Sequence, residues 1–213
     1  MLSSTIPIFP LPNVVLFPNV FLPLHVFEPR YRQMVSDALA GDRMIGMVLL
    51  QPGFEADYDG RPPVYDVGCA GLITHVERLP GGRFNIVLRG LEKFRIVGEQ
   101  EPASDVLYRR ALVAPIEEAA GPELARALKE GRRRLEALVS PLLEHAGAEQ
   151  MLPPAMPDED LVNALAQYLE LEPVERQALL ERAGPLARCQ SLVELLEMKA
   201  LAERGPGGPD LVH

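Results

Sequence analysis

The chain has 213 residues, of which 47% are hydrophobic, so it is long enough for one large domain or two small ones with cores of their own. Its net charge is −9, and the acidity lies in the back half: residues 1–115 carry 11 Lys and Arg against 12 Asp and Glu, whereas residues 116–213 carry 10 against 18. Such an acidic chain is a poor candidate for binding a nucleic-acid backbone, which requires clustered cations.

Cysteine usage and hydropathy indicate the compartment. Cys69 and Cys189 lie far apart and belong to no CxxC or Cys/His cluster, so we expect two buried, reduced thiols. The first residues lack the basic start of a signal peptide, and no apolar run approaches the ~20 residues that span a bilayer. We therefore expect a soluble, cytoplasmic protein without a membrane partner.

The first 25 residues contain short apolar runs separated by prolines, which excludes a long helix. We predict short extended segments at the edges or bends of a sheet. Pro29 is a good first residue for a helix whose apolar positions, from Tyr31 to Leu39, recur at helical spacing and end at Gly41. Residues 44–50 form a continuous apolar run, which is typical of a strand buried on both faces.

A hairpin is the clearest local signal. Residues 71–79 and 83–89 alternate as strands do, and Pro80-Gly81-Gly82 forms the turn between them. The alternation places one set of side chains on each face of the return strand: Phe84, Ile86 and Leu88 on one, Asn85, Val87 and Arg89 on the other. With further strands predicted over 93–97 and 108–116, six or so short strands and one helix indicate a small mixed barrel.

After residue 117 the hydrophobic period becomes helical. Helices are predicted to start at Pro122, near Asp158, at Pro173 and at Pro185, each with an apolar stripe. We therefore predict an α+β protein with a barrel over 1–117, a four-helix bundle over 118–204 and a disordered tail over 205–213.

Common catalytic motifs are missing from the sequence. It contains no GxxxxGK[ST], GxGxxG, HExxH, GxSxG or SxxK pattern, so we expect no enzyme activity, no catalytic residues and no cofactor. A small enzyme with Cys69 and His75 in an unrecognised site is an alternative. His25 and Glu28 could form a metal or acid–base pair, but we favour a hydrogen bond that fixes a corner, because a metal site needs three or more ligands. No metal is expected.

Two other sets of residues have two interpretations each. Arg83, Arg89, Lys93 and Arg95 could bind nucleic acid or an acidic partner, but we favour a solvated sheet face whose charges protect its edges. The apolar residues of 16–22 fit core packing, and some of them could line a groove that accepts apolar polypeptide.

A family resemblance covers most of the chain. The run from Ile6 through Pro10-Leu11-Pro12, Leu22-Pro23-Leu24-His25 and Phe27-Glu28-Pro29-Arg30-Tyr31 resembles the start of the N-terminal domain of Lon proteases. Residues 79–90 and Phe94-Arg95-Ile96 also fit, and 160–196 are similar to the helical part of that domain.

The resemblance implies a PUA-like β-barrel with one or two helices, followed by a helical bundle. In Lon this region recognises substrate polypeptides and helps to assemble the hexamer, and it does no chemistry. We expect the chain to end before an ATPase or protease domain, and to act as a non-catalytic adaptor or ATP-independent binder of unfolded or apolar segments. Self-association is compatible with this hypothesis, and RNA binding through the barrel is the alternative.

The resemblance also suggests roles for single residues. His25, Glu28 and Arg30 belong to the family signature and are expected to build the corner between barrel and helix. The residues expected to contact polypeptide are Phe17, Phe21, Tyr31 and Met34.

Overall fold

The computed structural model describes residues 3–54, 58, 60–101, 104–119, 121–146 and 155–203. The fold is mixed α and β, as predicted, and the tail expected at 205–213 lies outside the described residues. The elements are β1 (Thr5–Leu11), β2 (Phe21–Val26), α1 (Pro29–Ala40), β3 (Met44–Leu49), β4 (Val67–Leu79), the 3-10 turn η2 (Pro80–Gly82), β5 (Arg83–Glu99), β6 (Arg109–Pro115), α2 (Pro122–Ala146), α3 (Asp158–Tyr168), α4 (Pro173–Leu180) and α5 (Pro185–Glu203).

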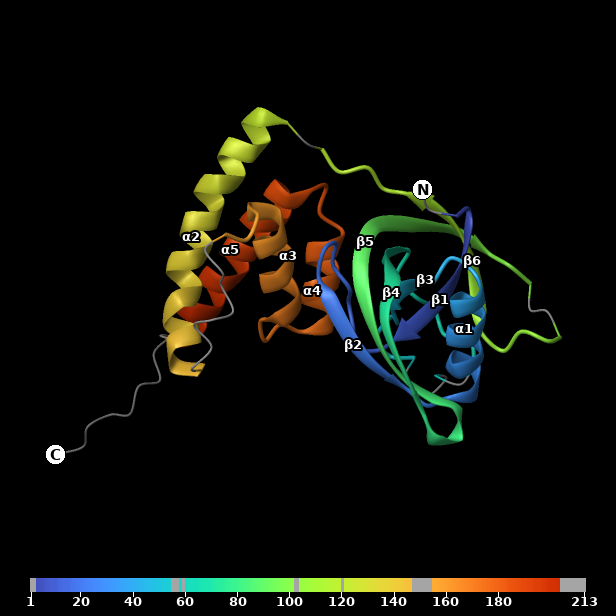
Figure 1. Cartoon of the computed structure of the whole chain (residues 1–213). Coiled ribbons are helices and arrows are strands. Elements are labelled where there is room, and N and C mark those ends of the chain that lie inside the picture. The colour runs from blue at the N-terminus through green and yellow to red at the C-terminus, as the bar shows by residue number, and fades with distance from the viewer. Residues whose placement is uncertain are drawn as a thin grey trace. The chain divides into compact units, whose positions relative to one another are not determined.

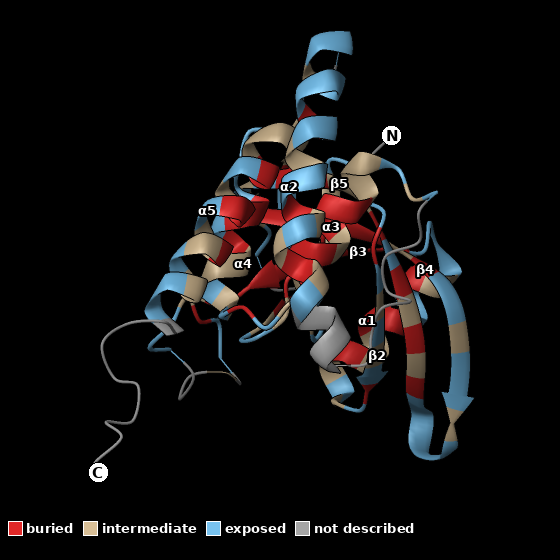
Figure 2. Cartoon of the chain, turned by 90° about the vertical axis from the view of Figure 1, so that its left-hand side faces the viewer, coloured by how far each residue is buried: buried red, intermediate tan, exposed pale blue. Residues whose placement is uncertain are grey.

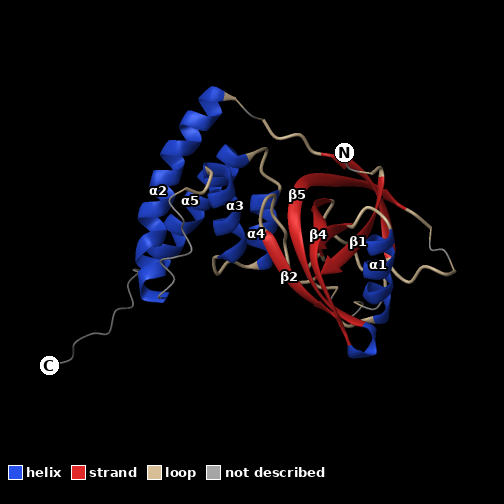
Figure 3. Cartoon of the chain, in the orientation of Figure 1, coloured by secondary structure: helices blue, strands red, loops and turns tan. Residues whose placement is uncertain are grey.

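The strands form one sheet (Figures 1 and 3), and their order in it is β2-β5-β4-β3-β1-β6. β1 runs parallel to β3, and the other pairs are antiparallel. β6 also pairs with the far end of β5, so the pairings β5–β4–β3–β1–β6 close into a ring. Among the described strands, β2 lies outside this ring and pairs with β5 alone.

The length of β5 makes this arrangement possible. It has 17 residues: residues 84–89 pair with β2, residues 83–95 pair with β4, and residues 94–99 pair with β6. The sequence predicted two separate strands, 83–89 and 93–97, whereas the structure has one. The prediction that the proline-rich start lies at sheet edges holds for β2 but is wrong for β1, which lies between β3 and β6 despite Pro7 and Pro10.

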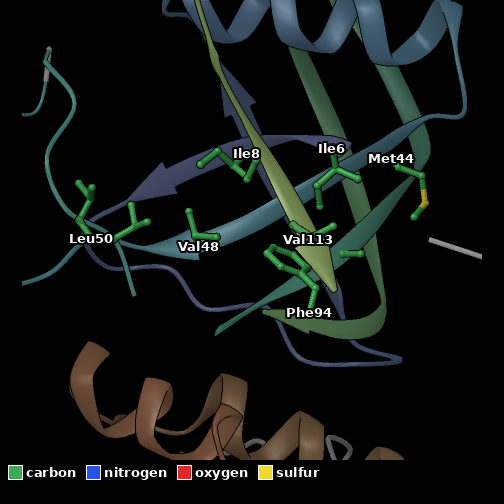
Figure 4. Close-up of a cluster of buried hydrophobic side chains, with 10 residues drawn as sticks. Ile6, Ile8, Met44, Val48, Leu50, Phe94 and Val113 are labelled. Carbon is green, nitrogen blue, oxygen red and sulfur yellow. The ribbon is translucent and has the colours of Figure 1, made fainter. Parts of the chain in front are cut away.

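The core of the sheet is built from apolar side chains of five strands and the loop before β4. Figure 4 shows the buried cluster of Ile6, Ile8, Met44, Val48, Leu50, Val64, Ala70, Phe94, Ala111 and Val113. The Phe94 ring lies against two glycines, since a Cβ added at Gly46 or Gly68 would stand 2.9 or 2.6 Å from its Cζ atom. Glycine at both positions therefore makes room for the largest side chain of the cluster.

Helix α1 follows the predicted pattern. It begins at Pro29 and buries one stripe, and the backbone N–H of Gly41 donates to Asp37 and Ala38 at its end. Because Tyr31, Met34, Val35 and Ala38 all lie on the buried side, the stripe belongs to the core.

The chain divides into two compact units. The first contains Met1–Glu117 and Asn163–Glu181, and the second contains Glu118–Val162 and Arg182–His213. The sequence predicted all helices of 118–204 as one bundle. The structure differs, because α4 and most of α3 group with the strands.

The second unit is held together by α2 and α5. A Cβ at Gly131 would stand 2.7 Å from Cys189 Sγ, so glycine at this position allows close approach of the two helices. The fully buried Arg188 guanidinium lies 2.6 Å from the Glu118 carboxylate.

None of the helices that the structure describes has both the length and the apolar character needed to cross a bilayer.

Candidate functional site

A concave surface of the first unit lies on the sheet face opposite the core. In β5, the side chains of Phe84, Ile86 and Leu88 point inward, so the alternate residues point outward. Strand register adds neighbours from β2 and β4, since Pro23 and His75 both lie opposite Val87. We call this surface the outer face and define it by Phe21, Pro23, His25, His75, Glu77, Asn85, Val87 and Arg89.

A β-bulge in β4 turns the side chains that follow it toward the outer face. Ile73 is buried and pairs with Leu88, and in a regular strand His75 would point inward as well. The register shifts between Ile73 and His75, and the Thr74 hydroxyl donates to the Val87 carbonyl at 3.1 Å. The extra residue reverses the alternation, so His75 and Glu77 reach the outer face.

The outer face is hollowed. A hollow of about 370 Å³ is lined by Pro23, Leu24, His25, His75, Glu77, Asn85, Ile86 and Val87. Figure 2 shows that the end of the β4–β5 hairpin is mostly exposed or intermediate, in contrast to the buried strand segments. Among the lining residues Pro23, His25, His75 and Glu77 are exposed, so the hollow is accessible from the surface of the first unit.

Exposed aromatic side chains lie on either side of the β2 residues that line the hollow, at Phe21 and Phe27 in the sequence and at Tyr168 of α3, which bonds to Phe21. Phe21 is 50% exposed, Phe27 is 60% exposed and Tyr168 is 49% exposed. The Phe27 ring stacks against His25 with a centroid distance of 6.0 Å, and the Tyr168 hydroxyl donates to the Phe21 carbonyl at 2.5 Å. Large exposed aromatics close to a hollow are typical of surfaces that bind other molecules.

Side chains of α3 brace the segment that carries Phe21. The Phe17 N–H donates to Gln167 Oε1 at 3.0 Å, and Gln167 Nε2 donates to the Phe21 carbonyl at 3.1 Å. Asn163, one turn earlier, donates to the Pro18 carbonyl at 3.0 Å. These bonds satisfy backbone groups that no strand partner reaches and fix the start of β2.

The same bonds show how the free edge of β2 is protected. The Phe21 carbonyl points away from β5 to α3, so by the two-residue period the Pro23 nitrogen also points away from β5. Proline has no N–H to offer there, and the carbonyl is already bonded. The edge is thus poorly suited to accept a further strand, whereas the outer face is open.

The four residues predicted to contact polypeptide do not lie together on the surface. Phe17, Tyr31 and Met34 are buried, and a buried side chain cannot touch a partner without rearrangement of the core. Phe21 alone of the four is exposed. The surface residues that the sequence interpretation missed are Phe27, His75, Glu77, Asn85, Val87 and Tyr168. The alternation of residues 83–89 did contain part of this signal.

The signature residues lie at a corner, but in two separate networks. His25 bonds to Asn85 across the outer face, and Glu28 instead receives bonds from Arg30 and Tyr58, so the predicted His25–Glu28 contact is replaced. The Arg30 guanidinium lies 4.6 Å from the ring centroids of both Tyr31 and Tyr58. This cation–π stack holds Tyr58 against the start of α1.

Tyr31 also has a structural role. Burial first, and then the nearby Tyr58, raises the pKa of Tyr31 well above its ordinary value. The phenol therefore remains protonated and donates to the Pro10 carbonyl at 3.3 Å, and its ring packs on Phe9.

The cationic residues of the β-rich part do not form one patch. Lys93 is 2% exposed, and its ammonium group donates to the Leu180 carbonyl at the end of α4, so its prediction as part of a solvated face is wrong. A lysine at that position is favourable because helix carbonyl ends carry partial negative charge. Arg83, Arg89 and Arg95 are exposed, as expected.

A second, smaller hollow and the cysteines lie elsewhere in the described part of the chain. A hollow of about 40 Å³ near Tyr108 contains Arg61 and Arg109, but both guanidinium groups are bonded to Glu99. Among the described residues, no group of three His, Cys, Asp or Glu side chains is placed to hold a metal ion. Cys69 and Cys189 are buried free thiols, as predicted, and burial, followed by Asp158, raises the pKa of Cys189 to about 11.

Comparison with known families gives one match over nearly the whole chain. Residues 5–198 match the family model described as the ATP-dependent protease La (LON) substrate-binding domain. Lon protease 2 of Syntrophobacter fumaroxidans is 30% identical over 210 residues, which cover 95% of this chain and 26% of the relative. Lon protease of Trichlorobacter lovleyi is 33% identical over 200 residues, covering 92% and 24%. The chain thus spans about a quarter of the length of these curated relatives.

Solved structures agree in fold. The N-terminal domain of Mycobacterium avium complex Lon protease superposes with a TM-score of 0.69 at 16% identity, covering 91% of this chain and 98% of that one. A Lon N-terminal domain protein from Xanthomonas campestris gives a TM-score of 0.60 at 23% identity, covering 90% and 98%. At these identities the likeness concerns the fold alone.

Proposed function

Because the chain belongs to the family of ATP-dependent protease La (LON) substrate-binding domains, we propose that it is a non-catalytic module that binds unfolded or apolar polypeptide segments through its outer face. The observation that carries the proposal is the hollow on the outer face, together with exposed Phe21 on the same face and exposed Phe27, whose ring stacks on the lining residue His25. Apolar rings and hydrogen-bonding groups side by side suit a polypeptide, whose side chains and backbone need both.

The binding mode follows from the state of the sheet edge. A polypeptide that added to β2 as a new strand would meet Pro23, which offers no donor, and the Phe21 carbonyl, which is occupied by α3. We therefore propose that the bound segment lies across the outer face and makes side-chain contacts, instead of extending the sheet.

The proposal has two wider parts and one alternative. The closed ring of pairings supports the interpretation of the first unit as a PUA-like barrel. The role would be that of an adaptor or an ATP-independent binder in the cytoplasm, alone or with further copies of itself. RNA binding has less support, because Lys93 is buried and the hollow contains the Glu77 carboxylate.

The test is binding of a fluorescently labelled, permanently unfolded polypeptide, followed by fluorescence anisotropy. We expect saturable binding at tens of micromolar or better, and Phe21→Ala should weaken it about 5- to 30-fold, the usual effect of truncating an aromatic anchor. Phe54→Ala is the matched control, because Phe54 is 44% exposed and does not belong to the outer face.

Two results would contradict the proposal. One is the absence of binding to any unfolded chain at tens of micromolar. The other is an equal loss of affinity in Phe21→Ala and Phe54→Ala, which would assign binding to a different surface. A gel-shift assay with RNA at low salt tests the RNA-binding alternative, since contacts to phosphates are strong at low salt and weaken as salt is added.

A further inference from the structure

A chain of hydrogen bonds crosses the outer face from β2 to β4. His25 Nδ1 lies 2.8 Å from Asn85 Oδ1, and Asn85 Nδ2 lies 2.6 Å from Glu77 Oε2. The three side chains come from adjacent strands in register, since His25 and Glu77 both lie opposite Asn85. All three line the hollow.

The chemistry of these groups fixes the direction of the chain. A carboxylate only accepts, so Asn85 must turn its NH₂ group toward Glu77 and its oxygen toward His25. That oxygen only accepts, so His25 must carry a proton on Nδ1. In the neutral imidazole Nε2 then presents a lone pair, and among the described residues neither His25 Nε2 nor Glu77 Oε1 has a hydrogen-bond partner.

The charges around the hollow favour a cation. Glu77 carries the one formal charge among the eight lining residues when both histidines are neutral. Arg83 and Arg89 do not line the hollow: the Arg89 guanidinium donates to Asn19, and the Arg83 guanidinium donates to the Pro80 carbonyl at the hairpin turn. Two acceptors, one of them negative, thus lie in an open hollow.

Resting on the function proposed above, we propose that this hollow accepts the side chain of a lysine or arginine of the bound polypeptide. The preferred ligand is an extended segment with one large apolar residue that contacts Phe21 and one basic residue that contacts His25 and Glu77. Phe21 and His25 are four residues apart on one strand, about 13 Å at the rise of a β-strand. The apolar and basic residues of the ligand are therefore expected four positions apart.

The test compares three labelled peptides that differ at one position. Each has an aromatic residue followed four positions later by Lys, Gln or Glu, and dissociation constants are measured by anisotropy with the full chain. The Lys peptide should bind about tenfold more tightly than the Gln peptide, as is usual for a hydrogen bond to a charged partner, and the Glu peptide should bind most weakly.

Glu77→Gln removes the charge while keeping the shape, and it should bring the affinities for the Lys and Gln peptides to within about twofold. Glu170→Gln removes one exposed carboxylate outside the hollow and should leave the Lys preference unchanged. Equal binding of the Lys and Gln peptides, or an intact preference in Glu77→Gln, would overturn this inference alone. If no peptide binds, the proposed function fails together with it.

Discussion

Gly90 is the residue that brings the start of β2 onto β5. Its N–H donates to the Val20 carbonyl and its carbonyl accepts from the Asn19 N–H, both at 2.9 Å. A Cβ at this position would overlap the Phe17 carbonyl oxygen and stand 2.8 Å from the carbonyl carbon. Backbone cannot move aside as a flexible side chain can, so only glycine fits without displacing the turn.

We expect Gly90→Ala to lower the free energy of unfolding by about 2–3 kcal/mol, at the upper end of the range for overpacked sites. Urea denaturation monitored by circular dichroism measures the change. Gly98→Ala is the control in the same strand, because its Cβ would meet nothing closer than Leu112 Cδ1 at 3.7 Å. Equal stability of the two variants would show that the turn moves freely.

The burial of a single residue could be predicted from sequence where a local period determines it, and not where a distant contact does. Alternation correctly separated Ile86 from Val87, because a strand has a two-residue period. The same apolar character made Phe17 and Phe21 look equivalent, yet one is buried and the other is exposed. Their difference arises from the turn on Gly90 and from α3, and neither contact leaves a local signal in 16–22.

At the scale of elements, α3 acts as a brace for the Phe17–Phe21 segment. Its polar side chains Gln167 and Asn163 are buried although they are not part of an active site. Burial of an amide is favourable only when its hydrogen bonds are made, and here the partners are backbone groups of the loop.

Gln167→Ala should therefore lower the free energy of unfolding by about 1–3 kcal/mol, since it removes the hydrogen bonds of the buried amide to the Phe17 N–H and the Phe21 carbonyl. Tyr168→Phe, which removes only an exposed hydroxyl bonded to the Phe21 carbonyl, should cost less. Urea titrations measure the free energy of unfolding of both variants. A larger effect of Tyr168→Phe would contradict the role assigned to Gln167.

The elements themselves were largely predictable, and their connections were not. The helix starts at Pro122, Asp158, Pro173 and Pro185 agree with the sequence, because proline and acidic first turns are local signals. The continuity of β5 was missed, since it depends on pairing with β6 at its far end. The bulge at Thr74, which turns His75 and Glu77 to the outer face, was also missed, since it depends on the pairing of β4 with β5.

At the scale of the whole molecule, two carboxylates respond to pH in opposite ways. In the second unit, burial first, and then the charge of Glu118, raises the pKa of Glu159. In the first unit, burial alone would raise the pKa of Glu99, but hydrogen bonds from Arg109 and Arg61 outweigh it and the pKa is lowered.

The stability effects have opposite signs. The native state binds the Glu159 proton more tightly than the unfolded chain, so Glu159 favours folding in acid, and this contribution is lost as pH rises through the folded pKa. Glu99 favours folding above its unfolded pKa, and this contribution is lost as pH falls through the folded pKa. At pH 7 we expect Glu159→Gln to stabilise and Glu99→Gln to destabilise, as measured by thermal unfolding between pH 4 and pH 8. Shifts of the same sign would refute the assignment.

The division into units was the feature least accessible from sequence. A helical period shows that α4 has an apolar side, but not which neighbour covers it. In the structure the Gln177 amide donates to the Val67 carbonyl, and the Lys93 ammonium donates to the Leu180 carbonyl. These long-range bonds join α4 to the sheet, while the period change near 117 only marks where strands stop.

A discontinuous first unit has a consequence for how the protein is made. Ribosomes add about 5–20 residues per second, so several seconds pass between the emergence of β6 and that of α4. During this interval the nascent chain contains all six strands but lacks the helices that bond to Phe17, Val67 and Lys93. The first unit is therefore completed only after most of the chain has been synthesised, and until then the sheet lacks its hydrogen bonds to α3 and α4.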